Sequence, residues 1–376
     1  MAGVRWDAQR LDAEEPATLP GMPTLRGLLR SVQVPEFPGL TFHEVRSRSA
    51  LNEVPGDSRV PFRWTINPYR GCSHACVYCY SRGSHQWLEL DSGRDFDTQV
   101  VVKTNLVDVL RRELARPSWR REHVALGTNT DPYQRAEGRY RLMPGVISAL
   151  AGSGTPFSVL TKGTLLRRDL PLLAAAARDV PVGLGVSLAI WDDELHASLE
   201  PGVPGPRARL ELVRAITDAG LSCGVFLAPV LPGLTDRLAD LDAALRAVAE
   251  AGATGVTVVP LHLRPGAREW FSAWLAREHP ALVARYRQLY RRGAVVAPEY
   301  CSWLAGRVAP LLARYGLDRQ AGGAARGVDG GGAPAGIPGD GDRDFPAGSL
   351  PATRPDPRPA QVRRAAGRLG EQLTLL

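Results

Sequence analysis

Short apolar runs that alternate with amphipathic segments are the feature that most constrains the fold of this 376-residue chain. The apolar runs carry few charges, which is typical of strands buried on both faces of a parallel sheet. Regular alternation with helices favours parallel strands joined by right-handed crossovers. The predicted strands occupy residues 62–67, 123–128, 157–161, 182–188, 223–230 and 255–261.

Amphipathic segments fill the intervals between these runs, and Gly220 and Gly252 stand where a helix commonly ends. The first strand is not followed by the Gly-x-Gly-x-x-Gly turn of dinucleotide-binding sheets, so we favour an open barrel. The fold class we predict is α/β, a partial (βα)6 TIM-type barrel with its chemistry at the C-terminal ends of the strands. The predicted helices occupy residues 106–115, 144–151, 169–177, 207–219 and 238–251.

Composition divides the chain into four parts. Residues 1–58 are a proline-containing leader, partly ordered, with a short helix at about 23–33. The barrel core spans 59–263, and residues 264–317 form a helical extension. Residues 318–376 are rich in Gly and Pro and have too little apolar surface to offset the entropy of ordering. We expect a flexible tail whose last residues, 361–376, could form a short helix.

The charge balance restricts partners only weakly. Lys and Arg number 46 against 39 Asp and Glu, a net charge of +7 that permits a nucleic-acid partner without demanding one. Lys103 and Lys162 are the only lysines, so arginine use reflects compositional bias and a retained lysine is more informative. We assign no role to Lys103, which we place at the opening of a helix. Because the sequence has neither a long uncharged apolar run nor a signal-peptide pattern, we predict a cytoplasmic protein without a membrane partner.

Three cysteines carry the strongest chemical signal. Cys72, Cys76 and Cys79 are spaced C-x3-C-x2-C directly after the first predicted strand. Without a nearby fourth cysteine, they would leave one iron of a cubic [4Fe-4S] cluster without a protein ligand and open to another molecule. A zinc site that adds His74 is the alternative. It lacks the second, distant ligand pair that structural zinc sites usually have, so we favour the cluster.

This motif, at this place in a barrel, resembles the radical S-adenosylmethionine (SAM) superfamily, and Tyr78 matches the aromatic residue usual before the third cysteine. The resemblance covers roughly residues 60–262. It implies a [4Fe-4S] cluster on the three cysteines and SAM bound to the open iron. It also implies reductive cleavage of SAM to a 5′-deoxyadenosyl radical that takes hydrogen from a substrate. An external one-electron donor, such as flavodoxin or ferredoxin, would supply the electron.

The resemblance also implies SAM contacts at the strand ends. Asn129 and Thr130 would meet the amino-acid end of SAM, and Lys162 would meet its carboxylate. Ser187 would contact the ribose, and Tyr78 would lie near the adenine.

Several of these residues have plainer alternatives. Asp131 and the proline after it could simply form a turn, and Ser187 could be a buried hydroxyl bonded to the backbone. His262, at the end of the sixth strand, could approach a substrate, but we favour a hydrogen bond at the rim. Aromatic residues and arginines between 270 and 292 could stack nucleic-acid bases, but we favour packing on the barrel.

Residues 127–134, 199–201 and 229–236 resemble one branch of the superfamily, the photolyase-like proteins related to spore photoproduct lyase. The lyase itself carries a hydrogen-donating cysteine just after the second strand, where this chain has Thr128. Cys223 and Cys301 do not obviously replace it. A radical SAM enzyme with an unassigned substrate is therefore the favoured function. A DNA-lesion lyase and a non-catalytic, metal-stabilised nucleic-acid-binding protein are the alternatives.

Overall fold

The computed structural model describes residues 27–55, 60, 62–318 and 345–350. The terminal helix expected at 361–376 and the first residues of the helix expected at 23–33 lie outside these ranges. Within the described residues, no helix is both long and apolar enough to cross a membrane.

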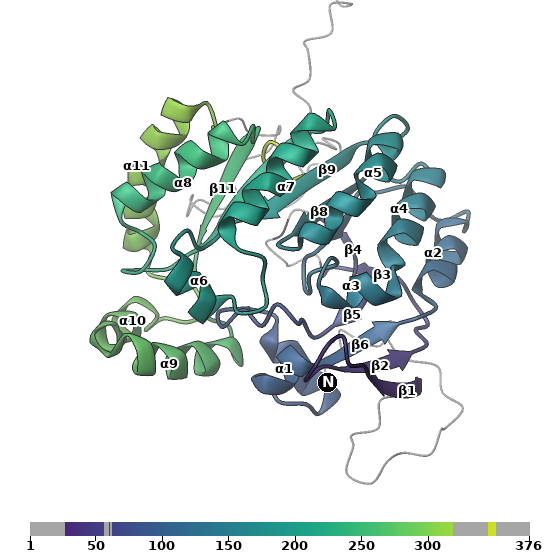
Figure 1. Ribbon diagram of the computed structural model, residues 1–376, viewed down its shortest axis with the longest axis horizontal. Coiled ribbons are helices and arrows are strands. Elements are labelled where there is room, and N and C mark those ends of the chain that lie inside the picture. The colour runs from purple at the N-terminus through teal and green to yellow at the C-terminus, as the bar shows by residue number, and fades with distance from the viewer. Residues whose placement is uncertain (1–26, 56–59, 61, 319–344, 351–376) are drawn as a thin grey trace, which may run out of the picture.

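The main sheet has the order β11-β10-β9-β8-β7-β4-β3 (Figure 1). Six of its strands, β4 and β7 to β11, run parallel, and each pairs with the next one along the chain. The first strand of the sheet, β3 (Leu51–Glu53), pairs antiparallel with β4 at the edge. This arrangement confirms the predicted partial six-stranded barrel. The parallel strands are β4 (Trp64–Ile66), β7 (Val124–Leu126), β8 (Phe157–Thr161), β9 (Val182–Ser187), β10 (Cys223–Val230) and β11 (Gly255–Pro260).

Helices cover the outer face of this sheet (Figure 1). Their apolar residues recur every three or four positions, so each helix buries one face against the strands. Gly220 and Gly252 follow two of these helices with φ angles of +77° and +85°, as predicted for helix ends. The covering helices are α2 (Leu106–Leu114), α4 (Leu142–Gly152), α5 (Leu170–Ala176), α7 (Pro206–Asp218) and α8 (Leu238–Glu250). The short helix α3 (Arg135–Tyr140) packs instead on a second sheet, where Tyr140 contacts Phe42 and Glu44. The elements η3 (Thr164–Asp169) and α6 (Asp193–Leu199) follow β8 and β9.

A second sheet, with the order β1-β2-β6-β5, lies beside the barrel (Figure 1). The helix predicted at about 23–33 is wrong over 28–33, because that segment pairs antiparallel with β2. Side-chain bonds support the pairing: Ser31 Oγ lies 2.8 Å from His43 Nδ1, and Arg30 Nε lies 2.7 Å from Glu44 Oε2. The strands are β1 (Leu28–Gln33), β2 (Thr41–Val45), β5 (Tyr69–Arg70) and β6 (Gln99–Lys103).

The region after the barrel is helical. Its aromatic residues Phe271, Trp274 and Tyr286 are buried, and the Phe271 ring contacts the other two. These residues therefore pack within the protein, which is the role that we favoured over the stacking of nucleic-acid bases. Residues 345–350 contact the N-terminal ends of the barrel strands. The helices are α9 (Ala267–Glu278), η4 (Pro280–Leu282), α10 (Val283–Leu289) and α11 (Pro298–Tyr315), and the loop after the cysteines contains η2 (Arg82–Leu88) and α1 (Arg94–Thr98).

Candidate active site

A cavity of about 380 Å³ lies at the C-terminal ends of the parallel strands. Its size falls within the range of about 300–1,000 Å³ typical of small-molecule sites. Every residue that the sequence analysis assigned to cluster or SAM binding lines it. These residues are Cys72, Cys76, Tyr78, Cys79, Asn129, Thr130, Lys162 and Ser187.

The loop that carries Cys72, Cys76 and Cys79, here called the cysteine loop, follows β5 and is held by a buried side-chain amide. Gln134 donates from Nε2 to the Gly71 carbonyl at 3.0 Å, and its Oε1 accepts from the Ser73 amide at 2.9 Å. Because both ends of the side chain are used, Gln134 fixes the backbone on either side of Cys72. Gly202 closes the loop from another direction, since a Cβ there would lie 2.0 Å from the Ser73 carbonyl oxygen.

Arg82 holds the other end of the loop. Its side chain is fully buried and donates twice to the Cys76 carbonyl, at 2.9 and 3.0 Å, and to Asp97 at 2.8 Å. The guanidinium lies 5.3 Å from the ring centre of Phe96 and 5.1 Å from that of Trp270. Trp270 belongs to the helical extension, so this extension helps to fix the cysteine loop.

The three thiols are free; Cys72 and Cys76 are buried and Cys79 is partly buried. Burial raises the pKa of Cys79 to about 11 and that of Cys76 well above its usual value. A buried thiolate therefore needs a cation, which a bound metal provides. Among the described residues, no three His, Cys, Asp or Glu side chains are grouped as a metal-ion site. A cubane differs from a single ion because each thiolate binds a different iron, so free thiols lining one cavity fit it.

His74, the fourth ligand of the zinc alternative, pairs with Asp131. Burial alone would lower the pKa of His74, but Asp131 and Cys72 outweigh it and raise the pKa to about 10. The Nδ1 atom of His74 lies 3.4 Å from Asp131 Oδ2, and both side chains are buried. The same carboxylate accepts bonds from the Thr161 hydroxyl and the Lys162 amide, both at 2.6 Å. Asp131 thus joins the cysteine loop to the end of β8, a role that goes beyond the turn expected from sequence.

Asn129 and Thr130 follow β7 and line the cavity as predicted. The Thr130 hydroxyl, however, donates to the Tyr69 carbonyl at 2.8 Å, and the residue is 2% exposed. Its side chain therefore anchors β5, which leaves Asn129 as the freer polar side chain of the pair.

Lys162 stands immediately after β8 at the centre of a polar network. Its Nζ lies 3.0 Å from Tyr78 Oη, 2.9 Å from Ser187 Oγ and 2.8 Å from Glu200 Oε1. The structure therefore brings together three residues that the sequence predicted only separately. The alternative role of Ser187, a buried hydroxyl bonded to the backbone, is also present, since this hydroxyl donates to the Ala228 carbonyl at 3.3 Å.

Glu200 completes this network, although the sequence indicated it only as the middle residue of the resemblance at 199–201. It is fully buried, and its Oε2 accepts from Arg209 Nη2 at 2.7 Å. Tyr78 also donates its hydroxyl to Glu200. Burial alone would raise the pKa of Glu200, but Arg209 and Lys162 outweigh it and hold the pKa well below its usual range.

The remaining candidates occupy the edge of the site or lie outside it. His262 lines the cavity, and burial lowers its pKa. Tyr80 donates to the Thr128 carbonyl. Cys223 begins β10 at the opposite end of the strands, is fully buried and does not line the cavity, and Cys301 lies in α11.

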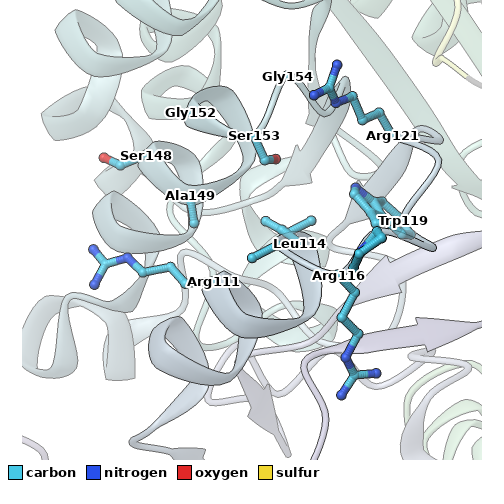
Figure 2. A pocket seen from close by; sticks show the side chains of 12 residues that line it. Arg111, Leu114, Arg116, Trp119, Arg121, Ser148, Ala149, Gly152, Ser153 and Gly154 are labelled. Carbon is cyan, nitrogen blue, oxygen red and sulfur yellow. The ribbon is translucent and has the colours of Figure 1, made fainter.

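Figure 2 shows a larger hollow, of about 760 Å³, formed by residues of α2, α4 and the segments after them. Arg111 and Arg116 extend away from each other there, so their guanidinium groups do not converge on one point. None of the predicted site residues lines this hollow. The predicted site residues therefore line the smaller cavity.

Comparison with known proteins identifies relatives by sequence and by fold. An uncharacterized protein of Mycobacterium tuberculosis is 61% identical over 318 residues, which cover 84% of this chain and 93% of that protein. An uncharacterized protein of Acidianus two-tailed virus is 27% identical over 219 residues, covering 56% of this chain and 71% of that protein. Spore photoproduct lyase complexed with dinucleoside spore photoproduct has a similar fold, with a TM-score of 0.54 at 15% identity over 73% of this chain and 79% of that one.

The family model of the Radical SAM superfamily matches residues 66–255, about half of the chain. The matched region contains the three cysteines, the four parallel strands β7, β8, β9 and β10 in full, and one residue each of β4 and β11. The chain therefore belongs to the radical SAM superfamily of enzymes.

Proposed function

We propose that Cys72, Cys76 and Cys79 hold a [4Fe-4S] cluster and that Lys162 and its neighbours hold SAM beside it. When bound, the cluster would supply the electron that cleaves SAM to a 5′-deoxyadenosyl radical, which takes hydrogen from a substrate. The observation that carries the proposal is the charged network around Lys162, which lines the same cavity as the three cysteines.

The charges of this network favour an anion. Glu200 is the carboxylate that both Lys162 and Arg209 contact, so the three charges sum to one excess positive charge. Arg209 and Glu200 are fully buried, whereas the side chain of Lys162 is 15% exposed and faces the cavity. A carboxylate that enters the cavity would therefore meet its compensating charge at Lys162.

Lys162 must exchange a partner to bind that carboxylate. An ammonium group has three N–H donors, and three oxygens surround Nζ. The Ser187 hydroxyl is the partner most easily replaced, since it has a second bond, to the Ala228 carbonyl. Glu200 would keep the ammonium oriented throughout, and Asn129 would meet the amino-acid end of SAM.

The substrate class is left open, because the neighbours that share this fold are only 15% identical. The second candidate is a DNA-lesion lyase, which only the similarity of fold supports. The resemblance aligns Thr128 with the lyase's hydrogen-donating cysteine, and this makes lesion repair the less favoured function. The electron would come from an external donor such as flavodoxin or ferredoxin.

Anaerobic reconstitution tests this proposal. Purified protein is loaded with iron and sulfide, reduced, and given SAM, and 5′-deoxyadenosine is measured by chromatography. We expect about four irons and four sulfides per chain and formation of 5′-deoxyadenosine. Stoichiometric zinc with negligible iron after reconstitution would overturn the proposal.

A further inference from the structure

We propose that residues 345–350 form the floor of the cofactor cavity: the N-terminal end of the barrel binds this segment of its own chain, and the bound segment closes the cavity on that side. The segment is drawn in yellow in Figure 1. Its role as a cavity floor rests on the proposed function, whereas its binding to the barrel does not.

The barrel leaves room for the segment because two strands lack side chains where it lies. Closed eight-stranded barrels are ordinarily filled by layers of bulky branched side chains. Here a Cβ at Gly183, in β9, would lie 2.5 Å from Phe345 Cδ1 and 2.7 Å from Ser349 Oγ. A Cβ at Gly224, in β10, would lie 2.3 Å from the Ala347 carbonyl oxygen. Two neighbouring strands are therefore shaped for the same short peptide.

The segment is in turn shaped for the barrel. Gly348 has a φ of +69°, and a Cβ there would lie 2.3 Å from the Gly255 amide nitrogen, so both its conformation and its close approach require glycine. Its carbonyl accepts a bond from the Thr254 hydroxyl. Phe345 is 5% exposed and its ring centre lies 4.3 Å from that of His123. These contacts reach strands β9, β10 and β11 and His123, the residue before β7.

Pro346 belongs both to this packed segment and to the wall of the cofactor cavity. It lines the same cavity as the cysteines, Lys162 and Ser187. Without residues 345–350 that part of the wall would be missing, and water could reach the cavity from the N-terminal side. A site that handles a reactive radical must exclude water and other reactants. The floor therefore restricts access to the C-terminal side, where Tyr80 is 42% exposed.

The test uses the full-length, metal-free chain, so it does not depend on cluster loading. Gly224→Ala places one methyl group where the Ala347 carbonyl lies and should displace the segment. Gly306→Ala is the matched control, because a Cβ there meets nothing within 4 Å. Phe345→Ser displaces the segment without altering the barrel, and it keeps the test valid if Gly224→Ala folds poorly.

Two measurements decide the outcome. Hydrogen–deuterium exchange should show residues 345–350 protected in the wild type and at least about tenfold faster in both displacing variants. Maleimide labelling of Cys72, Cys76 and Cys79 should also accelerate by about the same order when the floor is removed. Wild-type exchange that is already fast, or unchanged in the variants, would overturn the binding. Faster exchange with unchanged cysteine labelling would overturn the floor.

Failure of cluster loading would count against the proposed function and would leave both of these measurements intact. A difference in exchange between Gly306→Ala and the wild type would also count against the proposal, because it would show that the effect is not specific to the floor.

Discussion

At the C-terminal ends of its strands the barrel presents cysteines, a lysine and buried carboxylates, whereas at the N-terminal ends it presents glycines and a peptide from its own chain. Both ends are tightly packed, but by different interactions. Polar networks such as that of Glu200 hold the first, and close backbone contacts at Gly183 and Gly224 hold the second. The comparison shows how one sheet can keep one end open to a cofactor and close the other.

The two ends also differ in what a single substitution should do. Removing one partner of a buried charge pair leaves its neighbour uncompensated, so a change at the C-terminal end carries a large penalty. Adding a methyl group at the N-terminal end instead displaces a neighbouring segment.

Cys76→Ala should abolish iron binding after anaerobic reconstitution, because two thiolates cannot hold the cubane in place. Cys223→Ala makes the same change at the other end of the barrel and should retain the wild-type iron content. Iron and sulfide analysis measures both. Equal iron loss in the two variants would remove the distinction between the two ends.

Glu200→Gln should destabilise the metal-free protein by about 3–5 kcal/mol, because Arg209 and Lys162 lose the carboxylate that compensates their buried charges. Glu211→Gln, in the exposed Glu211–Arg214 pair on α7, should change the stability by less than about 1 kcal/mol. Urea denaturation followed by circular dichroism measures both. A similar loss in the two variants would show that the buried network contributes no special stability.

The same network predicts a dependence on pH. The pKa of Glu200 is lower in the folded chain than its value of about 4.3 when unfolded. Its stabilising contribution is therefore present above about pH 4.3 and is lost as the pH falls further, toward the folded-state pKa. Glu200→Gln should remove this part of the acid sensitivity, which denaturation at pH 7 and pH 3 would detect.

Lys162→Ala should weaken SAM binding by about 1.5–3 kcal/mol, or roughly 10–150-fold, through loss of a charge-assisted bond. Iron content should stay at the wild-type level, since Lys162 follows β8 and the cysteines belong to another loop. Equilibrium binding to the reconstituted protein measures the affinity. Unchanged affinity would show that the excess positive charge of the network does not meet SAM.

The barrel could be predicted because its signals are local. The predicted strands at 157–161 and 223–230 match β8 and β10 residue for residue. The second sheet was missed because β2 pairs with β6 far along the chain, and β6 pairs in turn with the two-residue strand β5. Lys103, placed at a helix opening, instead ends β6 and is buried. The segment at 28–33 is a strand because β2 offers it a partner, which local propensity does not reveal.

The site was predictable to the extent that its residues belong to a recognisable motif. The three cysteines and Lys162 stood out by spacing and by rarity. Arg209 did not, because arginine is common throughout this chain. Glu200 gave only a weak signal, as the middle residue of a three-residue resemblance, and its network forms only when β8, β9 and α7 come together. Residues 345–350 gave none, since their burial depends on glycines far upstream.

The smallest expected effect concerns DNA repair: we predict little or no turnover of spore photoproduct. The resemblance to the lyase aligns Thr128 with its expected hydrogen-donating cysteine, and neither Cys223 nor Cys301 lines the cavity. Burial also raises the pKa of Cys223 to about 12, and this residue lies at the closed end of the barrel. The assay gives reduced, cluster-loaded protein SAM and a dinucleotide that contains the lesion, and measures thymine release. Any DNA association should fall steeply with salt, because it would depend on phosphate contacts. Catalytic release of thymine would contradict the prediction, and loss of that turnover in Cys223→Ala would show that the closed end of the barrel takes part in the chemistry.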